Sequence, residues 1–304
     1  MAELTISLGG VTFHNPVFVA SGTFGYGKEA GELVEVSRLG AVITKSITPE
    51  ERIGNPQPRI AELPAGMLNS IGLANVGVDR FIDEKLPFLK RLKTRVIVNV
   101  AGKTEDEFVQ VVRRLESQDG IDGYELNFSC PNVREGGLEF SQKPEITERL
   151  TARIREITHK LLIVKLTPNI TDIAPVAEAA ERGGADALSL INTVQGMAVD
   201  VETFRPRINT VIGGYSGPAI KPIALAKVYQ ARQAVRLPLI GIGGIMDGRD
   251  AVEFFLAGAT AVQIGTANFI DPRTGVRIID ELHEFLARKG MQRIQELIGA
   301  LQTE

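Results

Sequence analysis

The sequence predicts a (β/α)8 TIM barrel that occupies residues 1–304 as a single domain. Short apolar runs without polar interruption alternate with amphipathic helical patterns, and eight such runs occur along the 304 residues. Uninterrupted apolar runs are typical of strands buried on both faces of a parallel sheet. Eight strand–helix units in a chain of this length favour a closed barrel.

The alternative is an open, doubly wound α/β sheet. A dinucleotide-binding sheet of that kind usually carries a G-x-G-x-x-G motif directly after an early strand. The sequence has none there, and the glycine-rich segment at 241–248 lies late in the chain with a different spacing. The barrel is therefore the preferred prediction.

The individual elements follow from these patterns. The predicted strands are the runs at 16–22, 41–47, 95–102, 123–129, 161–167, 185–193, 237–245 and 261–267. Predicted helices include 104–118, 145–160, 172–184, 224–235, 247–259 and 276–290. The helix at 104–118 has the clearest start, because Thr104 and Glu107 have the spacing of a capping box. An apolar stripe from Phe108 to Leu115 gives it one face to bury.

The segments outside this alternation predict where a site lies. The first residues, LTISLGGVTF, predict an N-terminal β-hairpin that closes one end of the barrel. The connections at 48–70, 130–144 and 194–219 are long and each follows a strand, so we expect long βα loops over the opposite, C-terminal mouth. Active sites of such barrels lie at this mouth, and long loops without regular structure are usually functional.

Composition excludes several classes of function. The net charge is −3, the pI is about 5.8, aromatic residues make up 6% and Trp is absent, so we expect no nucleic-acid partner. The single cysteine, Cys130, allows neither an internal disulfide nor an iron–sulfur cluster, which suits a cytoplasmic protein. No apolar run approaches the roughly 20 residues that span a bilayer, and no signal peptide is predicted. The three histidines are scattered, so no metal site is expected.

Polar residues and glycines recur at the predicted strand ends. They are Ser21, Lys45, Ser46, Asn99, Asn127, Lys165, Asn192, Thr193, Gly243, Gly244, Gly265 and Thr266. A single Asn or Lys at such a position is usually a turn former or a solvated side chain. Burial of an unpaired polar group costs about 1–3 kcal/mol, so several at one rim indicate a ligand that satisfies them.

The residue types indicate the character of that ligand. Glycines after the seventh and eighth strands match the phosphate site that many barrels build there. Two lysines favour further negative charge, and amide side chains suit a planar heterocycle with C=O and N–H groups. A phosphate-bearing flavin with a small acidic heterocycle fits these features, and from spacing alone a sugar phosphate fits nearly as well.

Cys130 lies where the fourth apolar run ends. A lone cysteine is often a small buried hydrophobic residue. Here Pro131 and the glycine-rich segment at 134–137 place it on a loop instead. A thiol whose thiolate is stabilised by nearby cations can serve as a base or a nucleophile.

Several motifs resemble those of class 1 dihydroorotate dehydrogenases. They occur in order along nearly the whole chain: TKSIT at 44–48, LNSIGLANVG at 68–77, NFSCPN at 127–132, VKLTPN at 164–169, INT at 191–193, IGGI at 242–245 and IGTA at 264–267. Cysteine within SCPN marks class 1, whereas class 2 has serine there. The run NVREGG at 132–137 is more similar to the NAD-linked class 1B than to the fumarate-using class 1A.

This resemblance implies oxidation of (S)-dihydroorotate to orotate in pyrimidine biosynthesis, with Cys130 as the general base. It implies FMN contacts from Ser21, Lys45, Ser46, Asn99, Asn127, Lys165 and Ile191, and a phosphate site near Gly217, Gly243, Gly244, Gly265 and Thr266. It implies substrate contacts from Lys45, Asn69, Ser70, Ile71, Gly72, Leu73, Asn127, Asn132, Asn192 and Thr193.

A class 1B enzyme must also transfer electrons from its flavin to NAD. The chain has neither a dinucleotide fingerprint nor the cysteines of a cluster. The resemblance therefore implies a partner subunit that carries FAD and a 2Fe-2S cluster. The implied assembly is a heterotetramer, in which a homodimer of this chain holds one partner on each protomer.

Four other functions compete with this interpretation. A fumarate-using class 1A enzyme shares most of the motifs. A dihydrouridine synthase also uses a loop cysteine, but the acidic pI disfavours RNA. A flavin-free sugar-phosphate isomerase or aldolase could use Lys165 to form a Schiff base. A barrel that only binds a nucleotide is disfavoured by Cys130 on its loop.

Overall fold

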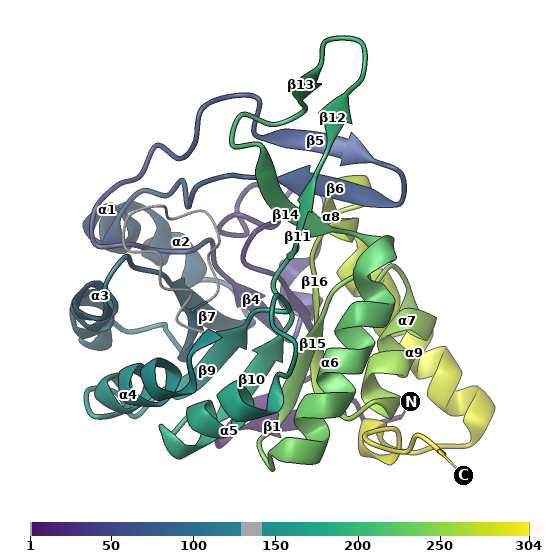
Figure 1. Ribbon diagram of the computed structural model, residues 1–304. Helices are drawn as coiled ribbons and strands as arrows, with labels where there is room; N and C mark the ends of the chain where they lie inside the picture. Colours follow the sequence, from purple (N-terminus) through teal and green to yellow (C-terminus); the bar gives the residue numbers. More distant parts are fainter. Residues whose placement is uncertain (1, 129–141, 304) are drawn as a thin grey trace.

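The computed structural model describes residues 2–128 and 142–303 and confirms the (β/α)8 barrel (Figure 1). Eight parallel strands close into one sheet, and each overlaps an apolar run that predicted it. In order around the barrel they are β3 (Val17–Val19), β4 (Ala41–Ile43), β7 (Arg95–Val100), β8 (Gly123–Asn127), β9 (Leu161–Leu166), β10 (Ala187–Leu190), β15 (Leu239–Ile242) and β16 (Ala259–Ile264).

Helices surround this barrel on its outer side (Figure 1). They are α1 (Val78–Arg80), a π-helical turn (Phe81–Lys85), α2 (Leu86–Leu89), α3 (Glu105–Glu116), α4 (Pro144–Arg155), α5 (Ala174–Arg182), α6 (Lys221–Ala234), α7 (Gly248–Leu256), α8 (Ala267–Ile270) and α9 (Thr274–Lys289). Short 3-10 turns lie at Val36–Arg38, Pro218–Ile220 and Ile294–Glu296. The connection from β3 to β4 has only the first of these turns in place of an α-helix.

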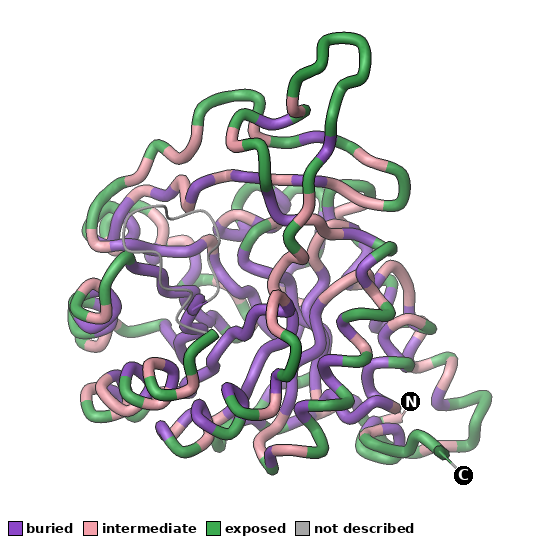
Figure 2. Tube along the Cα trace, in the orientation of Figure 1, coloured by how far each residue is buried: buried purple, intermediate pink, exposed green. Residues whose placement is uncertain are grey.

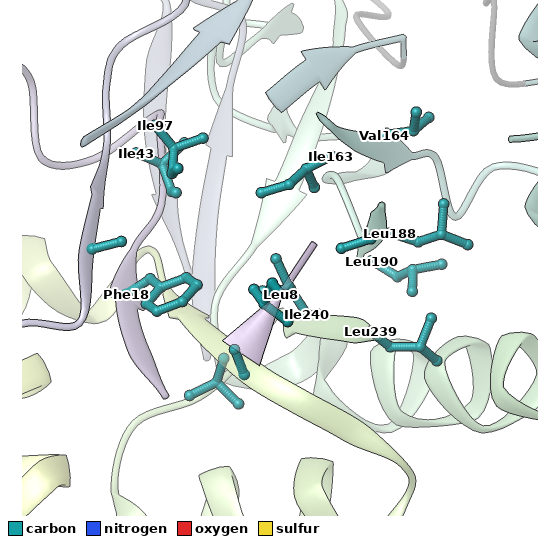
Figure 3. Close-up of a cluster of buried hydrophobic side chains, with 14 of the residues drawn as sticks. Leu8, Phe18, Ile43, Ile97, Ile163, Val164, Leu188, Leu190, Leu239 and Ile240 are labelled. Atoms are coloured by element: carbon teal, nitrogen blue, oxygen red, sulfur yellow. The ribbon is translucent and has the colours of Figure 1, made fainter. Parts of the chain in front are cut away.

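The interior of the barrel explains the uninterrupted apolar runs. Alternate residues of a strand point to opposite faces, so a strand with both faces covered is apolar throughout. Figure 3 shows side chains directed to the middle of the barrel, namely Phe18, Ile43, Ile97, Ile163 and Ile240. It also shows Val164, Leu188, Leu190 and Leu239 on the outer face of their strands. All of these are fully buried, and Figure 2 shows the buried barrel strands inside a more exposed helical layer.

A hairpin closes the N-terminal end of the barrel, as predicted. It consists of β1 (Ile6–Leu8) and β2 (Val11–Phe13), joined by two glycines at positive φ that a tight two-residue turn favours. Leu8 is fully buried among the barrel side chains (Figure 3), and the Phe13 ring lies 4.9 Å from that of Phe18. The hairpin therefore fills this end of the barrel.

The long connections are more ordered than the sequence suggested. Residues 48–70 contain β5 (Ile60–Leu63) and β6 (Gly66–Asn69), and residues 194–219 contain β11 (Val194–Met197) and β14 (Ile212–Ser216). These four strands form one antiparallel sheet in the order β11-β14-β6-β5, which we call the cap sheet. It lies across the C-terminal end of the barrel (Figure 1). A further two-stranded ribbon, β12 (Val199–Asp200) with β13 (Arg205–Pro206), extends beyond it.

The expectation of loops without regular structure was therefore wrong for two of the three connections. Strand β5 pairs with β6, and β11 pairs with β14, inside one connection each. The two connections are joined only by the pairing of β6 with β14, which lie more than a hundred residues apart, so no local periodicity could reveal the sheet as a whole. Of the third connection, 130–144, only the last three residues are described.

No helix in the described part of the chain has both the length and the apolar character needed to span a membrane. Within those same residues, no group of three or more His, Cys, Asp or Glu side chains could hold a metal ion.

Candidate active site

A cavity opens at the C-terminal mouth, between the barrel strands and the cap sheet. Residues that follow the barrel strands β3, β4, β10, β15 and β16 line it, together with side chains from β6, β8, β9 and β14. The parallel strands all end at this rim, so residues far apart in sequence meet there. Active sites in this fold usually lie at this rim.

Most of the predicted site residues surround this one cavity. They are Ser21, Lys45, Ser46, Asn69, Ile71, Gly72, Leu73, Asn127, Lys165, Ile191, Asn192, Thr193, Gly217, Gly243, Gly244, Gly265 and Thr266. The structure brings them together as expected, whereas the role of each remains a prediction. Cys130 and Asn132 lie outside the described residues.

Two predicted residues do not line the cavity. Asn99 is fully buried behind the wall: its Oδ1 accepts a hydrogen bond of 2.6 Å from Ser46 Oγ. Ser70 is also fully buried, and its Oγ has no hydrogen-bond partner in the described part of the chain. Neither side chain is therefore placed to contact a ligand in the cavity directly. Asn99 is linked to the cavity wall by its bond with Ser46, and its Nδ2 donates to the buried Glu125 carboxylate at 2.7 Å.

Amide side chains form a connected row on the wall. Asn192 Nδ2 donates to Asn127 Oδ1 over 3.2 Å, and Asn127 Nδ2 lies 3.5 Å from Ser46 Oγ. Asn69, across the cavity, donates from Nδ2 to the carbonyl of Gly214 in the cap sheet at 3.1 Å. These contacts fix the orientation of the three amides at the cavity wall.

Lys45 makes the wall electropositive. Burial is the main cause that lowers the pKa of its ammonium below the usual 10.5, and the nearby Arg59 guanidinium lowers the pKa further. Glu29 opposes this shift. The desolvated Lys45 ammonium favours an anionic ligand, because such a ligand offsets both its lost hydration and its repulsion by Arg59.

The glycine-lined end of the cavity fits a phosphate group. Gly217, Gly243 and Gly244 all have positive φ, which glycine adopts without strain. A Cβ on Gly265 would meet only Ala20 Cβ, at 3.8 Å, so the space beside this glycine is open. Nearby, Thr266 Oγ1 donates to Ser216 Oγ at 2.8 Å. Bare backbone and hydroxyl groups around open space are suited to an anion.

Two kinds of residue at or behind the cavity wall were not predicted from the sequence. The cavity is also lined by Ile60, Met67 and Phe269. No sequence pattern marked them as site residues, because apolar residues are common in the connections between strands. Glu125 had a signal: a carboxylate inside the apolar run of β8, where burial must be compensated. It is fully buried and lies 3.7 Å from Lys165 Nζ.

Comparison with known proteins agrees with this geometry. The family model described as "Dihydroorotate dehydrogenase" matches residues 3–286. The catalytic subunit of dihydroorotate dehydrogenase B (NAD(+)) from a Geobacter species is 51% identical over 300 residues, which cover 99% of this chain and 98% of that protein. The subunit of the same name from Caldicellulosiruptor saccharolyticus is 51% identical over 297 residues, 98% of each chain.

A solved structure extends the likeness to three dimensions. The crystal structure of the Eimeria tenella enzyme in complex with ferulenol superposes with a TM-score of 0.80 at 26% identity, over 98% of this chain and 88% of that one. The chain therefore belongs to the dihydroorotate dehydrogenase family, whose members are FMN-dependent oxidoreductases.

Proposed function

We propose that this chain oxidises dihydroorotate to orotate in pyrimidine biosynthesis, as the FMN-binding catalytic subunit of an NAD-linked enzyme. The observation that carries the proposal is the single cavity in which two lysines, a row of fixed amides and a glycine-lined end face one another. Curated relatives at about half identity over the full length are named as catalytic subunits of that enzyme type, which supports it.

The cavity residues divide between two ligands in this proposal. The glycine-lined end, with Thr266, holds the FMN phosphate, and Ser46 and Lys165 lie against the flavin ring. Lys45 pairs with the substrate carboxylate, while Asn69, Asn127 and Asn192 bind the C=O and N–H groups of the pyrimidine. Ile71 to Leu73, with Thr193, complete the substrate wall. Both ligands are anionic and partly planar, which matches the charge and the amides of the wall.

The reaction removes a hydride and a proton from neighbouring carbons of dihydroorotate. Bound FMN supplies the hydride acceptor. The proton needs a base on the opposite face of the substrate ring, and we assign that role to the thiolate of Cys130. A thiol is a usable base near neutral pH when cations stabilise its thiolate, and Lys45 makes this wall positive.

The test is to mix the purified protein with dihydroorotate in the absence of oxygen. We expect a yellow protein whose flavin absorbance bleaches on mixing. The variant Cys130→Ser should retain its flavin but bleach about 100-fold or more slowly at neutral pH, because a hydroxyl is a far weaker base. A colourless protein, or a flavin that dihydroorotate does not reduce, would contradict the proposal. Bleaching of the variant at the parent rate would remove Cys130 from the base role alone.

The assembly proposed with this activity is a heterotetramer. A homodimer of this chain would carry one partner subunit on each protomer, and the partner would hold FAD and a 2Fe-2S cluster. The words "catalytic subunit" in the names of the relatives support a second subunit. The sequence of this chain, with one cysteine, has no thiolates for a cluster of its own. We place the assembly in the cytoplasm, where a lone reduced cysteine is ordinary.

A further inference from the structure

Glu125 is a buried charge that the proposed reaction does not use. In the described residues, three charged side chains are buried: Glu125, Lys165 and Lys227. Lys227 donates to the carbonyls of Ile170 and Thr171, away from the other two. Glu125 Oε1 lies 3.7 Å from Lys165 Nζ, so these two form an ion pair inside the barrel.

The carboxylate of Glu125 is held from several sides. Its Oε1 accepts from Asn99 Nδ2 of β7 at 2.7 Å. Its Oε2 accepts from Ser189 Oγ of β10 at 2.9 Å and from Gln263 Nε2 of β16 at 2.6 Å. In the closed strand order β16 stands opposite β8, so the last bond crosses the barrel interior. A carboxylate with both oxygens so bound has one orientation.

Lys165 and Glu125 differ in their access to the cavity. Lys165 lines it, whereas Glu125 is fully buried and lies behind the wall. The groups that contact Glu125 from β7, β10 and β16 are two amides and a hydroxyl, and none of them titrates near neutral pH. Lys45, the other lysine on the wall, is influenced by Arg59 and Glu29. Lys165 is therefore the charged partner of Glu125 among the described residues.

We propose that Glu125 is a positioning residue, a fixed counter-charge that keeps Lys165 protonated and its ammonium at the cavity wall before the flavin is reduced. This inference rests on the proposed function, because FMN is the group toward which Lys165 acts. A buried ammonium without an anion beside it releases its proton readily, and an adjacent carboxylate prevents this. A cation already in place stabilises the negative charge of the reduced flavin without any reorganisation.

The test is the midpoint potential of the bound FMN as a function of pH in the parent and in Glu125→Gln. Glutamine keeps the size and a hydrogen-bond acceptor but removes the charge. We expect the proton on Lys165 of the parent to stay in place in both redox states, so that it adds nothing to the slope. In the variant we expect a proton to be taken up at this lysine when the flavin is reduced.

The expected result is a steeper fall of the potential in Glu125→Gln over part of the range from about pH 6 to about pH 10. One additional proton for two electrons changes the reduction equilibrium tenfold per pH unit, or about 30 mV per pH unit. Curves that run parallel across the whole range would overturn the inference. A parent protein that binds no FMN would instead overturn the proposed function itself.

Two control variants separate charge from packing. Glu125→Asp keeps the carboxylate and should retain the parent slope. Ser189→Ala removes one donor to Glu125 without changing any charge, so it should also retain the parent slope even if its melting temperature falls. A steeper slope in Ser189→Ala as well would show that packing of the network, and not the counter-charge, sets the effect.

A folding defect in Glu125→Gln would also be informative. A buried cation without its partner destabilises a protein, and removal of both charges relieves this. The double variant E125Q/K165M should then fold and bind FMN. A double variant that is as poorly folded as Glu125→Gln would assign Glu125 a structural role only and would overturn the inference.

Discussion

Lys45 shows how burial changes the chemistry of a single residue at this site. Its pKa lies below 10.5 because the ammonium loses hydration and faces Arg59. The folded chain therefore binds this proton less tightly than the unfolded chain does. Between the lowered pKa and 10.5, the contribution of this group to folding stability rises with pH. The same shift makes the charge of Lys45 sensitive to pH and to an anionic ligand.

Orotate binding should follow this titration. We expect the affinity for orotate to fall as the pH rises toward 10.5, because the lowered pKa lets Lys45 lose its proton below that value. Spectral titration of the bound flavin with orotate at several pH values measures this. In Lys45→Met the affinity should be weak throughout and should lack this part of the pH dependence. An affinity of the parent that stays constant over the range would disprove the assigned pairing.

Two glycines allow the cavity and the fold to be tested separately. A methyl group on Gly265 would enter open space, with Ala20 Cβ 3.8 Å away, whereas a methyl on Gly241 would overlap the ring of Phe254. Gly265→Ala should weaken FMN binding at least about tenfold and change the stability of the apoprotein by less than about 0.5 kcal/mol. Gly241→Ala should lower the stability by about 1–3 kcal/mol, because the ring and backbone must shift. Flavin titration measures FMN affinity, and chemical denaturation measures stability. Equal effects of both variants on FMN affinity would contradict the assignment of Gly265 to the phosphate site.

At the scale of elements, helix α3 forms where its local signals predicted it. Thr104 Oγ1 accepts from the backbone N–H of Glu107 at 3.2 Å. The Glu107 carboxylate accepts from the N–H of Lys103 at 2.7 Å, one residue before the cap that a reciprocal capping box would use. The apolar stripe from Phe108 to Leu115 is buried. Caps and stripes depend on neighbours within one turn, so the sequence alone reveals them.

The cap makes a measurable contribution to the helix. Thr104→Ala should destabilise the protein by about 1 kcal/mol, because an N–H at the start of α3 loses its acceptor. The matched control is Ser117→Ala at the other end of α3, where no N-cap bond is lost; it should change stability by less than about 0.5 kcal/mol. Chemical denaturation of both variants checks this. The same loss in both would show that the cap is not the cause.

At the scale of the whole molecule, distant segments combine to make the mouth. The cap sheet joins strand β6 from the second connection to β14 from the sixth, and the cavity lies between this sheet and the barrel. The chain lacks the dinucleotide fingerprint that would bind NAD.

The isolated chain should therefore reduce artificial dyes with dihydroorotate but should not reduce NAD. Addition of an electron-transfer subunit should restore NAD reduction, because electrons then pass through its cofactors. Steady-state assays with a dye and with NAD, with and without that subunit, measure both steps. NAD reduction by the chain alone at the dye rate would rule out the need for a partner.

The sequence by itself determined the barrel and most of the rim. The eight apolar runs predicted the strands because both faces of each are covered. Polar residues such as Lys45 and Asn127 predicted the site because the carboxyl ends of parallel strands meet at one edge. Helix α3 was predicted from its own capping residue.

Only the tertiary structure decided which strands cover the rim and which side chains are buried behind it. The cap sheet arises from pairing between segments whose partners are remote in sequence, such as Asn69 with Gly214. Asn99 lies behind Ser46 because strand closure turns its side chain inward. The bond from Gln263 to Glu125 exists because the closed barrel places β16 opposite β8. Contacts of this kind depend on how the strands close in space, which no local pattern of residues encodes.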